Sequence, residues 1–217
     1  MNGIPWPVFW ESIGQTLIMV VTTLVVGGVL GLLVGIALYV TRRGGLLANR
    51  WLFAVLNLLV NIVRPIPFII FITAIGPVTL AVVGTTIGTP AATFALVIAA
   101  TFGVSRIVEQ NLVTIDPGVI EAARSMGASP AYIIRTLLIP EALGPLILGY
   151  TFVFVAVVDM TAIAGAVGGG GLGSFAISYG YQRFNWQVTG LAVVTIIVLV
   201  QLAQFLGNSL ARKALRR

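Results

Sequence analysis

Long blocks of apolar residues are the feature that most constrains the fold of this chain. An α-helix rises 1.5 Å per residue, so about 20 apolar residues cross a hydrocarbon core about 30 Å thick. The composition agrees, because 59% of the residues are hydrophobic and only 8% are charged. We therefore predict an all-α, polytopic transmembrane helical bundle that forms a single domain over residues 1–217. About five spans are expected: Ile13 to Val40, Trp51 to Gly76, Ala91 to Val108, Leu143 to Ile163 and Val188 to Leu210.

The residue types that are missing exclude several kinds of site. The chain has no cysteine and no histidine, so it cannot form a disulfide, a Cys/His zinc site or a Cys–His or Ser–His catalytic pair. We expect neither a metal site nor catalysis by this chain alone. The net charge of +6 comes from basic residues at the ends of the apolar blocks. This placement indicates membrane topology rather than nucleic-acid binding.

The distribution of Lys and Arg predicts the orientation of the spans, because basic loops resist translocation. With the N-terminus outside, the outer stretches contain only Arg183, and Arg64 falls within a span and counts for neither side. The chain is therefore expected to be N-out and C-in. The inner stretches then contain the remaining basic residues: Arg42, Arg43, Arg50, Arg106, Arg124, Arg135, Arg212, Lys213, Arg216 and Arg217.

The second span contains a polar stripe followed by two prolines. Asn57, Asn61 and Arg64 recur at helical spacing, and Pro65 and Pro67 follow them, so the helix should bend there. A guanidinium that faces lipid is costly, so the stripe should face protein, water or headgroups. Two interpretations stay open: a tie between neighbouring helices, or a position beside a pathway.

A second pattern in the first span concerns small residues. Gly27, Gly31 and Gly35 lie on one helical face, which permits close approach between helix backbones. Packing within the chain is favoured over a seam between two copies.

The long polar stretch of residues 109–140 predicts two short helices at the inner face of the membrane. Asp116 can cap the first helix with Pro117 at its first position, and Gly127 can end it in a left-handed conformation. Ser129 and Pro130 repeat the same start. Pro140 is expected to interrupt the second helix before the next span.

The first of these short helices carries a small apolar face suited to a partner protein. Adjacent alanines let a partner approach the helix backbone, and flanking charges fix the orientation. The alternative is an amphipathic loop that lies on lipid headgroups. The apolar face consists of Val119, Ala122, Ala123 and Met126, with Glu121 and Arg124 around it.

This stretch resembles the EAA loop of ABC-importer permeases. Glu121-Ala122-Ala123, then Gly127, and then Leu137-Leu138-Ile139-Pro140 follow the order and spacing of that family's pattern, before the penultimate span. The resemblance implies a pair of cytoplasmic coupling helices, within residues 109–140, that dock on a separate ATPase. The residues it assigns to this role are Glu121, Ala122, Ala123, Arg124, Met126, Gly127, Ile139 and Pro140.

Other segments look like the methionine-importer permeases in particular. They are residues 61–70, 84–88, 164–173 and 179–181, together with the basic C-terminal tail. The resemblance implies a type I importer in the bacterial cytoplasmic (inner) membrane that carries methionine or a related amino acid.

The family also implies partners and a source of energy. We expect a second copy of the chain, two ATPase subunits that bind ATP and Mg, and an extracytoplasmic substrate-binding protein or lipoprotein. The glycine-rich run near residue 170 has no following Lys-Ser/Thr, so the phosphate cradle of a nucleotide-binding loop is absent from this chain.

Several residues are candidates for the pathway itself. Asn61, Arg64 and Asp159 are assigned to it, because charged groups inside spans usually face a cavity or a partner. For Asp159 an ion pair or a capping role is the favoured alternative to contact with a substrate ammonium group. A mobile outer gate and a passive linker are equally consistent with the run of Gly168, Gly169, Gly170 and Gly171.

Two rival functions remain at this stage. A secondary amino-acid transporter or a channel would work without an ATPase, although the sequence shows no convincing internal repeat of the kind such folds often have. A membrane scaffold without transport activity would use only the surface helices.

Overall fold

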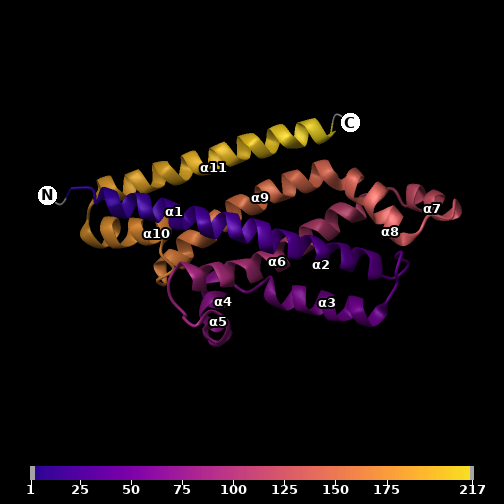
Figure 1. Cartoon of the computed structure of the whole chain (residues 1–217), viewed down its shortest axis with the longest axis horizontal. Coiled ribbons are helices and arrows are strands. Elements are labelled where there is room, and N and C mark those ends of the chain that lie inside the picture. The colour runs from indigo at the N-terminus through magenta and orange to yellow at the C-terminus, as the bar shows by residue number, and fades with distance from the viewer. Residues whose placement is uncertain (1–2, 216–217) are drawn as a thin grey trace.

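Long helices running along one axis form the body of the protein, and shorter helices lie between them and at its ends (Figure 1). The structure, a computed structural model, describes residues 3–215. Four helical segments are long and apolar enough to cross a membrane: Trp6–Thr41, Thr89–Val113, Pro130–Ala166 and Trp186–Ala214. A fifth span would be the bent pair Arg50–Val63 and Phe68–Ala74. The expected all-α bundle of about five spans is thus confirmed.

The helices follow one another with few connecting residues. Two of the long segments, Trp6–Thr41 and Pro130–Ala166, contain a π-helical turn, where the backbone widens locally without ending the helix. The elements are α1 (Trp6–Thr22), η1 (Thr23–Gly27), α2 (Gly28–Thr41), α3 (Arg50–Val63), α4 (Phe68–Ala74), α5 (Gly76–Val83), α6 (Thr89–Val113), α7 (Pro117–Ser125), α8 (Pro130–Ile133), η2 (Ile134–Leu138), α9 (Ile139–Ala166), α10 (Gly171–Phe175), η3 (Ala176–Gly180), η4 (Tyr181–Arg183) and α11 (Trp186–Leu215).

The helices are longer than the apolar blocks from which the spans were predicted. The first segment has 36 residues, or about 54 Å of helix, well beyond a core about 30 Å thick. Hydropathy marks only the part of a helix that matches the lipid core, whereas the helix itself continues through the headgroup region. Residues 109–113 likewise belong to α6, so the projecting stretch is shorter than the predicted segment 109–140.

The expected interruption at Pro140 is wrong. The chain stays helical from Pro130 to Ala166, with the π-helical turn η2 directly before α9. A proline in a regular α-helix lacks one hydrogen bond, and its ring clashes with the carbonyl four residues earlier. The wider turn ends with the Ile139 N–H bonded to the Ile134 carbonyl, five residues back, and accommodates the ring without breaking the helix.

The expected bend in the second span is confirmed. α3 ends at Val63, α4 begins at Phe68, and their axes differ by 109°. Pro67 precedes α4 with an extended backbone, and a residue before a proline is also disfavoured in helical conformation. The two prolines thus turn the chain sideways within the bundle.

The glycines of the first segment pack against another helix of the same chain. A Cβ atom at Gly31 would lie 2.6 Å from the Val104 Cβ, and one at Gly35 would lie 2.6 Å from the Val108 Cβ. Both distances are shorter than van der Waals contact, so only glycine lets α2 and α6 approach this closely. The interpretation as packing within the chain is confirmed.

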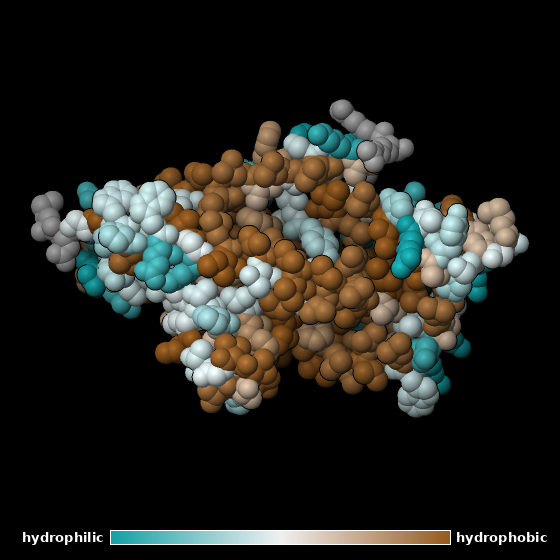
Figure 2. Space-filling model, in the orientation of Figure 1, coloured by the Kyte–Doolittle hydropathy of each residue, from teal (hydrophilic) through white to brown (hydrophobic). Residues whose placement is uncertain are grey.

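The surface of the bundle has the pattern of a membrane protein. Figure 2 shows a broad hydrophobic band along the bundle, with hydrophilic residues concentrated towards the two ends. The N-terminus and α10 lie at one end, and α7 and the C-terminus lie at the other (Figure 1). The N-out, C-in orientation stays a prediction. Arg216 and Arg217, which entered its basis, lie outside the described residues.

Candidate functional site

The projecting helix α7 has capped ends at the positions that the sequence predicts. The Gly118 N–H donates to the Asp116 Oδ1 at 2.8 Å, and Pro117 occupies the first turn. At the other end Gly127 has a φ of 81°. The N–H of Ala128 donates to the Ala123 carbonyl at 3.1 Å, and that of Gly127 to the Arg124 carbonyl at 2.9 Å. This pair of bonds is a Schellman motif, so α7 has a fixed length and direction.

The next helix begins as predicted. The Tyr132 N–H donates to the Ser129 Oγ at 3.3 Å, and Pro130 opens α8. Because both helices are capped, the turn between them is a defined corner rather than a loose loop. In Figure 1 this corner forms the tip of the molecule at the end opposite the N-terminus.

The predicted apolar face of α7 is divided between two surroundings. Ala123 is buried, at 8% exposure, in the apolar cluster that contains Ile133 and Leu138. Its assignment to a partner-contacting face is therefore wrong, because the helix needs one side to attach to its own chain. Met126 is 81% exposed. The remaining residues of the outward face are also exposed: Val119, Glu121, Ala122 and Arg124.

The last two residues assigned to coupling, Ile139 and Pro140, lie where the α7–α8 corner joins the long helix α9. Ile139 is half-buried and Pro140 is exposed at the start of α9. They join the α7–α8 corner to the span without a break, so movement of the corner would be carried directly into α9.

The polar stripe of the second span forms a tie between α3 and α6. The Arg106 guanidinium donates to the side-chain oxygens of Asn57 at 3.0 Å and Asn61 at 2.5 Å. The same guanidinium pairs with the Glu109 carboxylate at 2.6 Å. Both charged side chains are mostly buried, at 17% and 11% exposure. For Asn57 and Asn61 these bonds support the interpretation of the stripe as a tie between neighbouring helices.

Arg106 therefore does not belong to an inner loop, as the count of basic residues assumed. It lies within α6, and its charge is compensated by Glu109 three residues later. The spacing of Arg106 and Glu109 is a helical i, i+3 pair, which is the sequence signal that could have revealed this group.

Arg64 separates from the other members of the stripe. It caps the C-terminal end of α3 and lines a cavity of about 650 Å³ between α3, α4, α6 and α9. The cavity also has Gln110 and Asn111 as polar lining residues, and its apolar wall includes Phe71, Phe152 and Met160. A pocket with an apolar body and few polar groups is typical of a small-molecule site.

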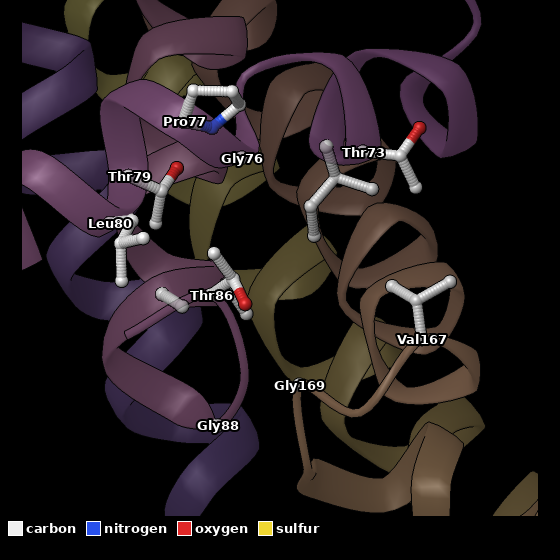
Figure 3. A pocket seen from close by; sticks show the side chains of 12 residues that line it. Thr73, Gly76, Pro77, Thr79, Leu80, Thr86, Gly88, Val167 and Gly169 are labelled. Carbon is white, nitrogen blue, oxygen red and sulfur yellow. The ribbon is translucent and has the colours of Figure 1, made fainter. Parts of the chain in front are cut away.

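A second pocket, of about 530 Å³, lies closer to the end that holds the N-terminus. Figure 3 shows Thr73, Thr79 and Leu80 around this pocket, with Val167 and Gly169 of the loop after α9 on another side. Thr86 and Gly88, from the turn before α6, and Gly76 and Pro77, at the start of α5, also line it (Figure 3).

An apolar layer separates the two pockets. Ala92 lines the outer one and Ala99 the inner one, which corresponds to about 10 Å along α6. Leu96, which lies between these two residues on α6 and lines neither pocket, belongs to a buried apolar cluster that also contains Ala92 and Ala164. Buried apolar side chains therefore separate the two pockets along α6.

The glycine-rich loop is anchored by α1. The Gly171 N–H donates to the Gln15 Oε1 at 2.7 Å, and the Leu172 N–H donates to the Thr16 Oγ1 at 2.9 Å. The Gly168 carbonyl accepts from the Gly88 N–H at 2.8 Å. Sequence reasoning did not identify Gln15 and Thr16, because nothing local marks a side chain whose partner lies 156 residues away.

The backbone of this loop also requires glycine at several positions. Gly168, Gly170 and Gly171 have φ values of 89°, 78° and 76°, a region that other residues adopt only with strain. Whether the loop is a mobile gate or a passive linker stays a prediction.

Asp159 lies on α9 and is exposed. Among the described residues the ion pair present joins Arg106 and Glu109 and does not include Asp159. The residue that caps the C-terminal end of α9 is Val167, not Asp159. The favoured ion-pair or capping role is therefore wrong within this chain. Asp159 adjoins Met160, which lines the inner cavity, and contact with substrate stays a prediction.

Apolar spans, a rigid projection at one end and two pockets within the bundle are features of a membrane transport component. Comparison with known proteins identifies which kind. Residues 27–216 match the family described as the binding-protein-dependent transport system inner membrane component. The chain belongs to this family.

Individual relatives cover most of the chain. It is 45% identical to the probable D-methionine transport system permease protein MetI of Vibrio cholerae, over 92% of this chain and 88% of the relative. It is 44% identical to the methionine import system permease protein MetP of Bacillus subtilis, over 79% of this chain and 77% of the relative.

Solved structures agree with the fold. A chain of the MetNI methionine ABC transporter, solved in inward-facing conformations, superposes with a TM-score of 0.94 at 40% identity, over 99% of both chains. An amino acid ABC transporter solved with histidines superposes with a TM-score of 0.79 at 20% identity, covering 95% of this chain and 94% of the other. The latter likeness supports the fold alone.

Proposed function

We propose that the chain is the membrane permease subunit of an ATP-driven importer for methionine or a closely related amino acid. The observation that carries this proposal is the doubly capped α7, which presents Met126 and Ala122 outward at the end opposite the N-terminus. A rigid helix with small and apolar residues at its surface fits a groove in a partner. The named relatives, which transport methionine, supply the substrate class.

The working assembly in this proposal contains two copies of the chain, two ATPase subunits at the α7 end, and an extracytoplasmic binding protein at the other end. ATP and Mg bind to the ATPase subunits, and this chain has no catalytic role. Closure of the ATPase pair pushes on α7, and the continuous helix from Pro130 to Ala166 carries the motion into the bundle.

The conformation corresponds to an inward-facing state in this proposal. The chamber of about 650 Å³ lies in the half of α6 and α9 nearer to α7, and the apolar layer closes it from the outer pocket. The similarity to a transporter solved in inward-facing conformations supports the same assignment. Alternating access then requires that the layer open while the inner half closes.

The inner chamber suits an amphipathic substrate such as methionine. Arg64 can face the substrate carboxylate, because guanidinium and carboxylate form charge-assisted hydrogen bonds. Phe71, Phe152 and Met160 surround the remaining volume, and thioether sulfur makes favourable contacts with aromatic rings. Asp159, next to this wall, is the candidate for the substrate ammonium group.

Reconstitution tests this function. Vesicles that contain the chain, its ATPase subunit and its binding protein should accumulate radiolabelled methionine only when ATP is present on the ATPase side. Uptake that persists without the ATPase would support a secondary transporter instead. Asp159→Asn should lower uptake across the pH range, whereas unchanged uptake would remove Asp159 from the pathway.

A further inference from the structure

The corner between α2 and α3 contains a basic cavity that the transport pathway does not use. Its volume is about 690 Å³, and its lining includes Arg43, Asn49, Arg50 and Phe53. In Figure 1 this corner lies at the same end of the bundle as α7. No acidic residue lines it, which makes it unlike the neighbouring smaller cavity, where Glu121 accompanies Arg42 and Arg124.

The two arginines of this cavity lack a compensating charge within the chain. Among residues 3–215 the ion pair present involves Arg106 and Glu109, and neither Arg43 nor Arg50 takes part in it. Arg50 is also the first residue of α3, where the positive end of the helix dipole faces it. Arg43 and Arg50 line the same cavity, so two positive side chains lie near a helix start of the same sign, which favours an anion there.

The backbone holds this corner in place. The Leu47 N–H donates to the Val40 carbonyl at 2.9 Å, and the Asn49 N–H donates to the Thr41 carbonyl at 3.0 Å. The Asn49 side chain accepts from the Leu52 N–H at 3.0 Å. The end of α2 and the start of α3 are thus tied together by hydrogen bonds. The backbone that carries the two arginines is already ordered, so a ligand binds without the entropic cost of ordering it.

The surroundings of the cavity identify the chemistry of its ligand. Trp51 is 80% exposed and Leu47 is 51% exposed beside the arginines, and exposed tryptophan at a span end is typical of the membrane interface. Phe53 adds an aromatic wall. A ligand that matches both the arginines and the apolar surroundings has two parts. It carries a phosphate at the level of the headgroups, and it carries apolar chains that continue along α3.

We propose that the α2–α3 corner binds the headgroup of an anionic phospholipid, with Arg43 and Arg50 as a clamp on its phosphate. Arginine is suited to this contact because its planar fork binds phosphate through two parallel hydrogen bonds. The site depends on the membrane placement of the bundle and not on the transported substrate, so it can fail while the proposed function holds.

The tryptophans of the chain allow a direct test. The chain has four, and the other three lie at the opposite end: Trp6, Trp10 and Trp186. Replacing these three with Phe leaves Trp51 as the only reporter. The full chain is then placed in phosphatidylcholine vesicles that contain increasing amounts of brominated phosphatidylglycerol, and quenching of Trp51 is followed.

The expected result is saturable quenching at a low fraction of brominated phosphatidylglycerol, well above that produced by the same fraction of brominated phosphatidylcholine. Arg43→Gln together with Arg50→Gln should weaken the preference by about fivefold for each charge removed. The matched control is Arg212→Gln with Lys213→Gln, which removes two charges from the end of α11 and should leave the preference unchanged.

Three outcomes would overturn the site. Trp51 quenching that rises linearly with the fraction of brominated phosphatidylglycerol would indicate contact with bulk lipid only. This outcome can be read from the protein with native arginines, so it does not depend on whether an arginine variant folds. An equal loss in the Arg212→Gln, Lys213→Gln control would indicate general surface attraction. Reversal by millimolar inorganic phosphate would assign the corner to a free anion rather than to a lipid.

Discussion

The side chain of Gln15 on α1 accepts a hydrogen bond at 2.7 Å from the backbone N–H of Gly171, 156 residues further along the chain. This contact fixes the start of α10, where two successive glycines have left-handed backbones. A loop of this composition would otherwise be among the more mobile parts of a protein. The loop beside the outer pocket is therefore tied to α1.

Removing this anchor should loosen the glycine-rich loop without altering the spans. Gln15→Ala leaves the Gly171 N–H unpaired, which costs about 1–3 kcal/mol. We expect faster amide exchange over residues 168–172 and a lower melting temperature. Because the Gln15 Nε2 donates to the Glu11 Oε1 at 3.0 Å, the conservative control is Gln15→Glu combined with Glu11→Gln, which keeps an acceptor oxygen for Gly171 without placing two carboxylates side by side and should keep protection. Equal protection in all three proteins would show that the contact does not restrain the loop.

The left-handed glycine at the end of α7 should be sensitive to β-branched residues. A side chain at Gly127 meets no atom within 4 Å, so Gly127→Val costs about 1–2 kcal/mol through backbone strain alone. Expected results are loss of ATPase subunits during purification and poor coupling of ATP hydrolysis to uptake. Gly14→Ala, in open space on α1, serves as the control and should behave like the native protein. Normal assembly of Gly127→Val would argue against the docking role.

The two faces of α7 should separate docking from folding. Met126→Glu changes an outward side chain and should weaken ATPase binding at least tenfold while the melting temperature of the chain alone stays constant. Ala123→Leu overfills the buried side and should destabilise the chain by about 1–3 kcal/mol. Titration with purified ATPase and thermal unfolding of the permease distinguish these results. The same stability loss in both variants would contradict the division of the helix.

The close approach of α2 and α6 should depend on glycine. Gly31→Val places its Cβ 2.6 Å from the Val104 Cβ, and the helices must move apart to relieve the overlap. We expect loss of about 1–3 kcal/mol or failure to fold, measured as melting temperature and yield in detergent. Unchanged stability would mean that the contact relaxes without cost.

Much of the fold follows from local sequence signals. The span count depends on hydropathy, the 109° bend follows from Pro65 and Pro67, and both ends of α7 follow from capping residues. Each of these features arises from a few neighbouring residues, and the physics that produces it is short-ranged. The class of transporter was predicted by the same stretch, because the order and spacing of Glu121 to Pro140 resembled the EAA loop.

The errors concern features that depend on distant partners. Arg106 was counted with a loop because its bonds to Asn57 and Asn61 come from another helix. Ala123 was placed on the outward face because helical periodicity does not say which side of a short helix attaches to its own chain. Pro140 was expected to break a helix that a π-helical turn preserves. In each case tertiary packing determined the outcome.

The most direct test of the account is the position of Met126 in the assembled transporter. Because the chain has no cysteine, Met126→Cys creates a single thiol at the tip of α7. A membrane-impermeant maleimide should label it in inside-out vesicles, should not label it in intact cells, and should be blocked once the ATPase subunit is bound. Labelling from the outside, or labelling that bound ATPase does not reduce, would contradict a coupling helix that transmits ATP hydrolysis to the transport pathway.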